Sequence, residues 1–247
     1  MKTGLIATLL LSACGAQNAA SSFEKGERGR VVRIIDGDAL VLDTGQSVRL
    51  IGIEAPAPER RNRAAAPYAE EAERLLEDIA LGRTVELRYA GLTRDRYDRA
   101  LAHVFTNDTL GPALWLNVEM LRRGGARLRV YPDTSEGTGP LVTAEVEARE
   151  AKAGLWSLPA YRPLRADEIP ADMFGFHIVQ GVLGSASPLE RHACSRSLMD
   201  SRLVLDISPA AGELCALASG ALLEARGYIN RGRMEITHGA NTKALER

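Results

Sequence analysis

The sequence predicts a mainly β protein with some α-helix, organised as two small β domains that a linker joins. Short apolar runs separated by turn residues occupy most of the chain after Arg30, and this alternation is typical of strands in β-rich domains. Three longer stretches carry apolar residues at a spacing of three to four, which indicates amphipathic helices. The 247 residues are 45% hydrophobic and 26% charged, so disorder over most of the chain is excluded.

Residues 28–160 are expected to form the first domain. Its strands are predicted at 31–35, 39–42, 48–53, 84–89 and 100–105, with short turns between the first three. Its helices are predicted at 68–81, 114–123 and 141–153. Five strands with one helix inserted and two appended are the outline of an OB-type five-stranded barrel.

The rest of the chain predicts a linker and a second domain. Residues 161–173 contain two prolines and mixed charges, as linkers often do. Residues 174–247 predict an accessory small β domain, barrel-like, with strands at 176–183, 202–207, 221–229 and 233–238.

The first 13 residues are typical of an export signal. Lys2 precedes the apolar run 5–11, which is too short to cross a bilayer as a helix. The run ends in Leu-Ser-Ala-Cys at 11–14, which resembles a bacterial lipoprotein signal whose cysteine, here Cys14, carries the lipid; an ordinary cleaved signal is the alternative. Gly15 follows where Asp would favour inner-membrane retention. We therefore expect a flexible tether at 14–27 and a periplasm-facing protein, anchored to the outer membrane only through Cys14.

Cys194 and Cys215 are the two cysteines that remain after the signal. An even pair in an oxidising compartment is compatible with a disulfide, while two buried thiols are the alternative. Neither lies in a CxxC motif or beside a histidine at metal-ligand spacing, so zinc is not expected.

The charge balance excludes a bulk polycation of the histone type, because 31 basic residues face 32 acidic ones. Arginine accounts for 27 of those cations, and its forked guanidinium matches phosphate geometry. A GC-rich genome produces the same bias, so composition does not decide. The clusters Arg60-Arg61-Arg63 and Arg122-Arg123-Arg127-Arg129 predict either a nucleic-acid track or a solvated surface.

Asp38 and Glu54 are the pair of acidic residues that most specifically indicates a functional site. If strands 39–42 and 48–53 form a hairpin, both acids lie at the same end of it, with Asp36 nearby. Such a cluster of hard oxygen ligands suits Ca²⁺. The alternative is an ordinary Asp-Gly-Asp turn and a solvated loop acid.

Arg49 and Arg99 lie in or beside apolar strands, where a charge needs a partner or a cleft. Beside a divalent cation, two arginines stabilise the negative charge of a phosphoryl transition state. Structural ion pairs, for example with Asp95 or Asp98, are the alternative. Strict strand alternation places Arg49 and Glu54 on opposite faces, so their convergence requires a break between them.

Three segments together resemble the signature segments of the staphylococcal nuclease (thermonuclease) family. They are Ile-Ile-Asp-Gly-Asp at 34–38, Val-Arg-Leu-Ile-Gly-Ile-Glu-Ala-Pro at 48–56 and Asp-Arg-Tyr-Asp-Arg-Ala-Leu-Ala at 95–102. Similar landmarks follow in the right order at 116–117, 124–126 and 154–156. The resemblance covers residues 30–158 and implies an OB-type barrel that hydrolyses DNA and RNA phosphodiesters with Ca²⁺.

The resemblance also implies roles by position. Asp38 and Glu54 are similar to the metal carboxylates, with Glu54 standing where Asp is usual, and Ala55 would supply a backbone carbonyl ligand. Arg49 and Arg99 resemble the phosphate-binding arginines, and Tyr97 resembles a nucleotide-contacting tyrosine. The segment 174–247 resembles small β-barrels appended to some nuclease-like proteins, which implies binding or packing rather than chemistry.

One position departs from the family pattern. The glutamate that serves as general base in the family is replaced by Ala57, and Glu59 follows two residues later. Either Glu59 fills the role or the base is lost. The sequence therefore leaves two functions open: an exported Ca²⁺-dependent nuclease, or a catalytically inactive module that binds nucleic acid or a protein partner in the same cleft. It indicates no oligomeric state.

Overall fold

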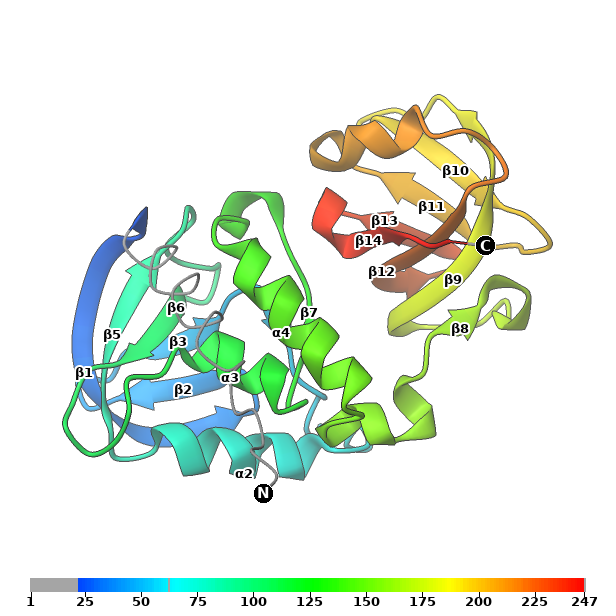
Figure 1. Cartoon of the computed structure of the whole chain (residues 1–247). Helices are drawn as coiled ribbons and strands as arrows, with labels where there is room; N and C mark the ends of the chain where they lie inside the picture. Colours follow the sequence, from blue (N-terminus) through cyan, green and yellow to red (C-terminus); the bar gives the residue numbers. More distant parts are fainter. Residues whose placement is uncertain (1–21, 62, 247) are drawn as a thin grey trace, which may run out of the picture.

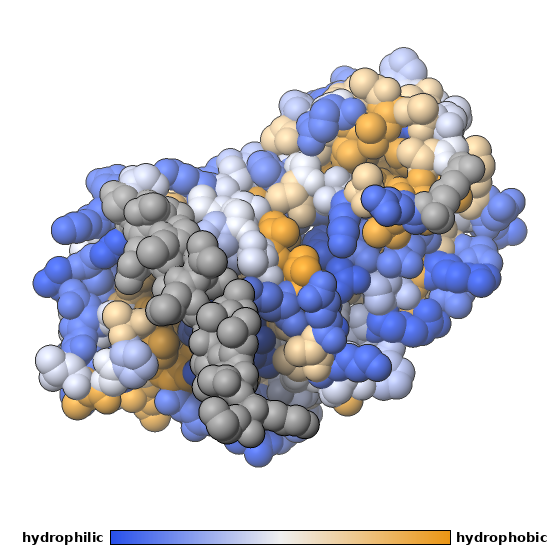
Figure 2. Space-filling model, viewed as in Figure 1, coloured by the Kyte–Doolittle hydropathy of each residue, from blue (hydrophilic) through white to orange (hydrophobic). Residues whose placement is uncertain are grey.

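The computed structural model describes residues 22–61 and 63–246, which form two β barrels (Figure 1). Helix α4 (Thr138–Glu150) lies on the side of the first barrel that faces the second. The face seen in Figure 2 is predominantly hydrophilic, with small hydrophobic areas on both barrels. No helix within the described ranges is long and apolar enough to span a membrane.

Five strands close the first barrel in the order β1-β2-β3-β6-β5, and β5 pairs back with β1. They are β1 (Glu24–Asp36), β2 (Ala39–Leu42), β3 (Ser47–Leu50), β5 (Thr84–Tyr89) and β6 (Ala100–Thr106). Strands β3 and β6 pair in parallel, and the other neighbours are antiparallel. The predicted OB-type barrel is confirmed.

Three helices cover this barrel: α2 (Ala69–Ala80), α3 (Leu116–Arg122) and α4. Helix α2 forms where expected because Ala72, Leu76 and Ile79 fall on one face, which is buried. Helices α2 and α3 sit within the predicted ranges, and α4 begins three residues earlier than predicted, at Thr138.

The predicted strand 48–53 is interrupted, and this break positions the site. Gly52 adopts φ 75°, a conformation that favours glycine, and the chain turns there. Ile53 and Glu54 leave the barrel as β4 (Ile53–Glu54) and pair with β7 (Arg127–Leu128). Arg49 and Glu54 can lie on the same side only if the strand is broken between them, and Gly52 provides this break.

The second barrel also closes on itself, because β12 pairs with β13 on one side and with β9 on the other. Its strands run in the order β12-β13-β11-β10-β9. They are β9 (Gly175–Ser187), β10 (Cys194–Leu198), β11 (Val204–Ile207), β12 (Leu222–Asn230) and β13 (Arg233–Ile236), with β8 (Leu164–Arg165) and β14 (Thr242–Ala244) added outside the ring. A disulfide joins Cys194 to Cys215.

Several boundaries differ from the sequence prediction. Strand β1 begins at Glu24 and the Phe23 ring is buried, so the expected tether extends too far into the first barrel. Strand β8 lies inside the expected linker and pairs with β9. Strand β10 was not predicted, because its Cys-Ser-Arg-Ser-Leu sequence holds few apolar residues. The export signal and Cys14 lie outside the described residues.

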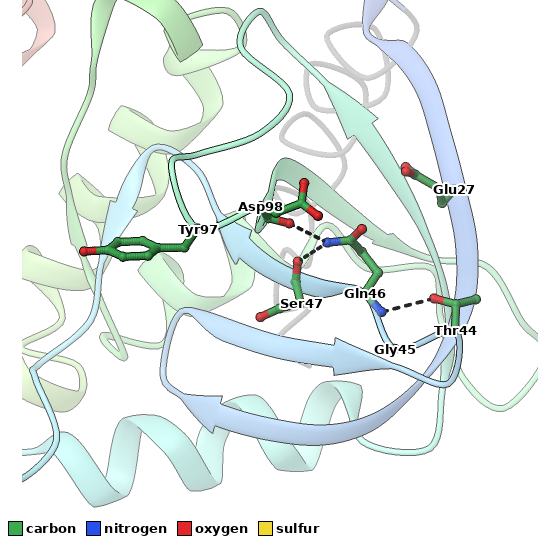
Figure 3. A pocket seen from close by; sticks show the side chains of 7 residues that line it. All are labelled: Glu27, Thr44, Gly45, Gln46, Ser47, Tyr97 and Asp98. Atoms are coloured by element: carbon green, nitrogen blue, oxygen red, sulfur yellow. Dashed lines mark hydrogen bonds between the residues drawn. The ribbon is translucent and has the colours of Figure 1, made fainter.

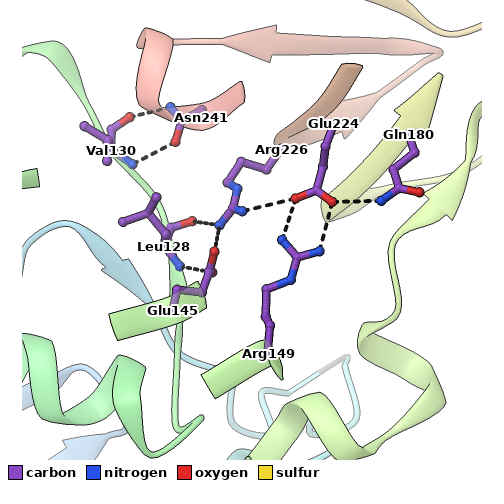
Figure 4. Close-up of polar contacts among 8 residues, drawn as sticks. All are labelled: Leu128, Val130, Glu145, Arg149, Gln180, Glu224, Arg226 and Asn241. Carbon is purple, nitrogen blue, oxygen red and sulfur yellow. Dashed lines mark hydrogen bonds and ion pairs between the residues drawn. The ribbon is translucent and has the colours of Figure 1, made fainter. Parts of the chain in front are cut away.

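Buried ion pairs join the two barrels (Figure 4). Arg226 of β12 binds Glu145 of α4, and Arg149 of α4 binds Glu224 of β12 with donor–acceptor distances of 2.6 and 2.9 Å. Glu145 also accepts the Leu128 backbone N–H at 2.7 Å. Because Glu145, Glu224 and Arg226 are nearly inaccessible to solvent, this network fixes how the barrels meet.

Candidate functional site

Asp38 lies in the tight turn between β1 and β2 and is buried. Its Oδ2 accepts the Ala55 backbone N–H at 2.7 Å, and its own N–H donates to the Asp36 carboxylate at 3.2 Å. A Cβ on Gly37 would lie 2.8 Å from the Cβ atoms of Ala55 and Ala72, so glycine permits the close approach. The turn and β4 thus bring Asp38 to the chain segment of Glu54.

The Arg49 guanidinium bridges the two predicted carboxylates. Its Nη1 lies 2.9 Å from Asp38 Oδ1, and its Nη2 donates to Glu54 Oε2 at 3.1 Å. Arg129, which follows β7, donates from Nη1 to the same Glu54 oxygen at 2.8 Å. Two arginines and two carboxylates therefore form one cluster, and about a fifth of the Glu54 side chain (21%) is exposed.

The ionisable groups of this cluster shift one another's pKa values. Burial raises the pKa of Asp38 well above its usual value; Arg49 opposes this shift, whereas Asp36 and Glu54 add to it. For Arg49, burial lowers the pKa, but Asp38, Glu54 and Asp36 outweigh it and raise the value. Three guanidiniums, those of Arg49, Arg127 and Arg129, interact with Glu54, but the buried Asp38 lies beside two further carboxylates, and a cation bound next to it would favour its charged form.

The donor chemistry of the cluster fits Ca²⁺, which prefers oxygen ligands. Both arginines bind Oε2 of Glu54, and no partner of Oε1 is recorded within residues 22–61 and 63–246. Asp36 was expected to join the cluster as a ligand, but no group of three acidic, histidine or cysteine side chains in those ranges is arranged to hold a metal ion. Asp36 instead accepts the Asp38 N–H. Two carboxylates, main-chain oxygen and water would make the coordination.

Arg99 contacts neither site carboxylate in the described part of the chain. Its Nε donates to Asp95 Oδ2 at 2.7 Å, and Asp95 also accepts the backbone N–H groups of Tyr97 and Arg99. These bonds hold the pKa of Asp95 below its usual value despite the opposing effect of burial. Arg99 thus forms an ion pair with Asp95, which was the alternative to a phosphate-binding role, and 32% of its side chain remains exposed.

Tyr97 is exposed and borders a hollow of about 560 Å³ (Figure 3). The Gln46 side chain donates to the Ser47 and Asp98 carbonyl oxygens across this hollow, and the Tyr97 ring extends away from it. The guanidiniums of Arg96 and Arg99 lie 4.9 and 5.7 Å from the Tyr97 ring centre. Tyr97 therefore offers an open aromatic face beside Arg99.

The structure does not bring Glu59 to the carboxylate cluster. Glu59 is exposed in the loop between β4 and α2, and no hydrogen bond or ion pair of its side chain is recorded in the described ranges. Asn62 in the same loop lies outside them. Ala57, at the position of the family's glutamate, carries only a methyl group.

The arginines of the basic cluster at 122–129 are held by ion pairs and aromatic rings within the described residues. Arg122 pairs with Glu119 and Glu147, and Arg123 pairs with Glu119. Arg127 is half-buried, its guanidinium lies 5.1 and 4.6 Å from the ring centres of Tyr161 and Phe176, and desolvation lowers its pKa. Of the other basic cluster, Arg60, Arg61 and Arg63 are exposed.

Arg129 is the site residue that sequence reasoning missed. It was grouped with the surface arginines because nothing in the sequence pairs β7 with β4. The alternation Arg127-Leu128-Arg129-Val130 is the local signal that could have indicated a short strand, with the two apolar residues on the buried face and the two arginines together on the other.

Comparisons with known proteins agree with this geometry. The family described as staphylococcal nuclease homologue matches residues 47–158. The chain is 30% identical to a thermonuclease of Staphylococcus intermedius over 145 residues, which are 58% of this chain and 83% of that protein. It is 34% identical to an uncharacterized endonuclease of Escherichia coli over 131 residues, 52% of this chain and 76% of the relative. The family match contains Arg49, Glu54, Arg99 and Arg129 but not the second barrel.

Proposed function

Since the chain belongs to the staphylococcal nuclease homologue family, we propose that it is an exported, Ca²⁺-dependent nuclease that hydrolyses phosphodiester bonds of DNA or RNA. The observation that carries this proposal is the Arg49 guanidinium between Asp38 and Glu54. A guanidinium, whose fork matches phosphate geometry, is already held next to two carboxylates.

Asp38, Glu54 and the Ala55 carbonyl would hold the ion. When bound, Ca²⁺ neutralises the two carboxylates and withdraws charge from a phosphate oxygen. With both carboxylates neutralised, the Arg49 guanidinium would be free to leave Asp38 and Glu54 and could donate two hydrogen bonds to the phosphate. Its preference for that geometry is the reason why lysine would replace it poorly.

Arg99 and Tyr97 would act on the substrate from the neighbouring loop. Arg99 would exchange its bond to Asp95 for one to a phosphate oxygen, at a modest cost because the pair is partly exposed. The open Tyr97 ring suits stacking on a nucleobase, which favours single-stranded or splayed nucleic acid as substrate.

A catalytically inactive nucleic-acid or protein-binding module is the second candidate function. It is favoured by Ala57, which cannot accept a proton, and by Glu59, which has no recorded hydrogen bond or ion pair to the cluster within residues 22–61 and 63–246. If the protein is an active nuclease, the loop that carries Glu59 brings this carboxylate to the attacking water when substrate binds.

A Ca²⁺-dependent nuclease assay on the purified protein tests both readings. A carboxylate that deprotonates water contributes about 10²–10⁴-fold. If Glu59 is the base, Glu59→Gln lowers the rate by about that factor and leaves Ca²⁺ binding unchanged. If the base is lost, the wild type is slow and Ala57→Glu increases its rate. A fast wild type that Glu59→Gln does not slow would contradict both assignments of the base.

Export and the lipid anchor are further parts of this proposal. The run at 5–11 and the Leu-Ser-Ala-Cys sequence support a lipoprotein at the periplasmic face of the outer membrane. We expect the chain to incorporate labelled palmitate in a bacterial host and Cys14→Ser to abolish the label. An unlabelled wild type would rule out the anchor.

A further inference from the structure

Side chains of the second domain form hydrogen bonds with the backbone of Val130, which lies next to the carboxylate cluster. The Val130 N–H donates to Asn241 Oδ1 at 3.0 Å, and the Val130 carbonyl accepts from Asn241 Nδ2 at 2.7 Å (Figure 4). The same carbonyl accepts the Thr237 hydroxyl at 2.8 Å. Val130 directly follows Arg129, so residues near the end of the chain fix the backbone from which Arg129 projects.

Phe176 of the second barrel also faces the arginines of this segment. Its ring lies 4.6 Å from the Arg127 guanidinium and 5.3 Å from that of Arg129, and its carbonyl accepts a hydrogen bond from Arg127 at 3.1 Å. Tyr131 supplies a second ring, 5.0 Å from Arg129. A guanidinium between two aromatic rings loses much of its rotational freedom, and its hydrogen-bonding edge is directed at Glu54.

We propose that Arg129 is a positioning residue of the carboxylate cluster and that the second barrel, through Phe176, holds it in place. This inference rests on the proposed function. Arg129 and Arg49 both bind Oε2 of Glu54, so neither arginine occupies Oε1, the oxygen that could bind a cation. Groups that orient a metal-binding carboxylate typically affect metal affinity by 10–100-fold. The accessory domain therefore contributes to the chemistry of the first barrel without supplying a catalytic group.

Calorimetric titration of the full chain with Ca²⁺ alone tests the positioning role. We expect Arg129→Ala to raise the Kd for Ca²⁺ by about 10–100-fold, Arg129→Lys to raise it less, and Phe176→Ala to raise it in the same direction. The double variant should bind no more weakly than Arg129→Ala, because both changes act on one contact. Phe174→Ala is the matched control: Phe174 precedes the same strand, but its ring packs on Tyr228 at 5.0 Å and should not affect Ca²⁺.

The outcomes separate this inference from the proposed function. If the wild type binds Ca²⁺ and Arg129→Ala binds it equally well or better, the positioning role is overturned and the nuclease proposal stands. If Phe176→Ala behaves as Phe174→Ala does, the contribution of the second barrel is overturned. A wild type that binds no Ca²⁺ contradicts the proposed function, and the metal-positioning role falls with it.

A double-mutant cycle on urea midpoints tests the Phe176–Arg129 contact without any metal. We expect the combined shift to be smaller than the sum of the two single shifts. Additive shifts would overturn the claim that Phe176 holds Arg129.

Discussion

The cluster around Asp38 and the network between the barrels are both built from arginines and carboxylates, but they differ in completeness. Between the barrels, both oxygens of Glu145 and of Glu224 accept hydrogen bonds, and Arg226 and Arg149 balance the two charges. Around Asp38, burial and two neighbouring carboxylates raise the pKa of the carboxyl group, and Oε1 of Glu54 has no recorded partner in the described ranges. A complete buried network holds elements together, whereas an incomplete one at the surface is suited to a ligand.

The largest expected effect concerns the complete network. Arg226→Ala should lower the free energy of unfolding by about 3–5 kcal/mol, because it leaves the buried Glu145 without its ion-pair partner, whereas Glu224 keeps Arg149. Urea unfolding of the full chain measures this. The control is Arg233→Ala, whose ion pair with Asp206 is partly exposed and should contribute at most about 1 kcal/mol. Equal losses for the two variants would contradict the structural role of the network.

The next effect is a pH dependence of the stability, which arises from the buried side chain of His103. His103 stacks on Phe23 at 4.6 Å, its Nε2 donates to the Glu136 carbonyl, and its Nδ1 has no partner in the described ranges. Burial lowers its pKa to about 4, only partly opposed by the hydrogen bond to Glu136.

The sign of the pH effect follows from that lowered pKa. Protonation is disfavoured in the folded state, so the stability is complete above the unfolded pKa of about 6.5 and is lost as the pH falls toward 4. The loss is about 3 kcal/mol in total. His103→Gln, which cannot be protonated, should show a flatter curve of unfolding free energy between pH 6.5 and 4.5. The His177 pKa is also lowered by burial, so the difference between the two curves is the test. Parallel curves would refute the assignment.

The sequence predicted the first barrel and its site better than the connections between distant parts. Local alternation and turn residues specify the strands from 31 to 54, and the Asp-Gly-Asp turn places Asp38. The partners of Arg127 and Arg129 depend on β4–β7 pairing and on Phe176, which no local pattern encodes. Strand β10 is not predicted from the sequence because it contains Arg196, which is buried here although arginine is usually a surface residue.

The most direct measurement compares Ca²⁺ binding and stability in Asp38→Asn. Asparagine retains an oxygen for the Ala55 N–H but removes the buried charge whose pKa is raised by burial. We expect the wild type to bind Ca²⁺ in calorimetric titration and Asp38→Asn not to bind it, while the urea midpoint of Asp38→Asn is at least as high as that of the wild type. Asp206→Asn in the second barrel is the control and should bind as the wild type does. A wild type without Ca²⁺ affinity, or an Asp38→Asn variant that keeps it, would contradict the claim that this incomplete cluster is a cation site.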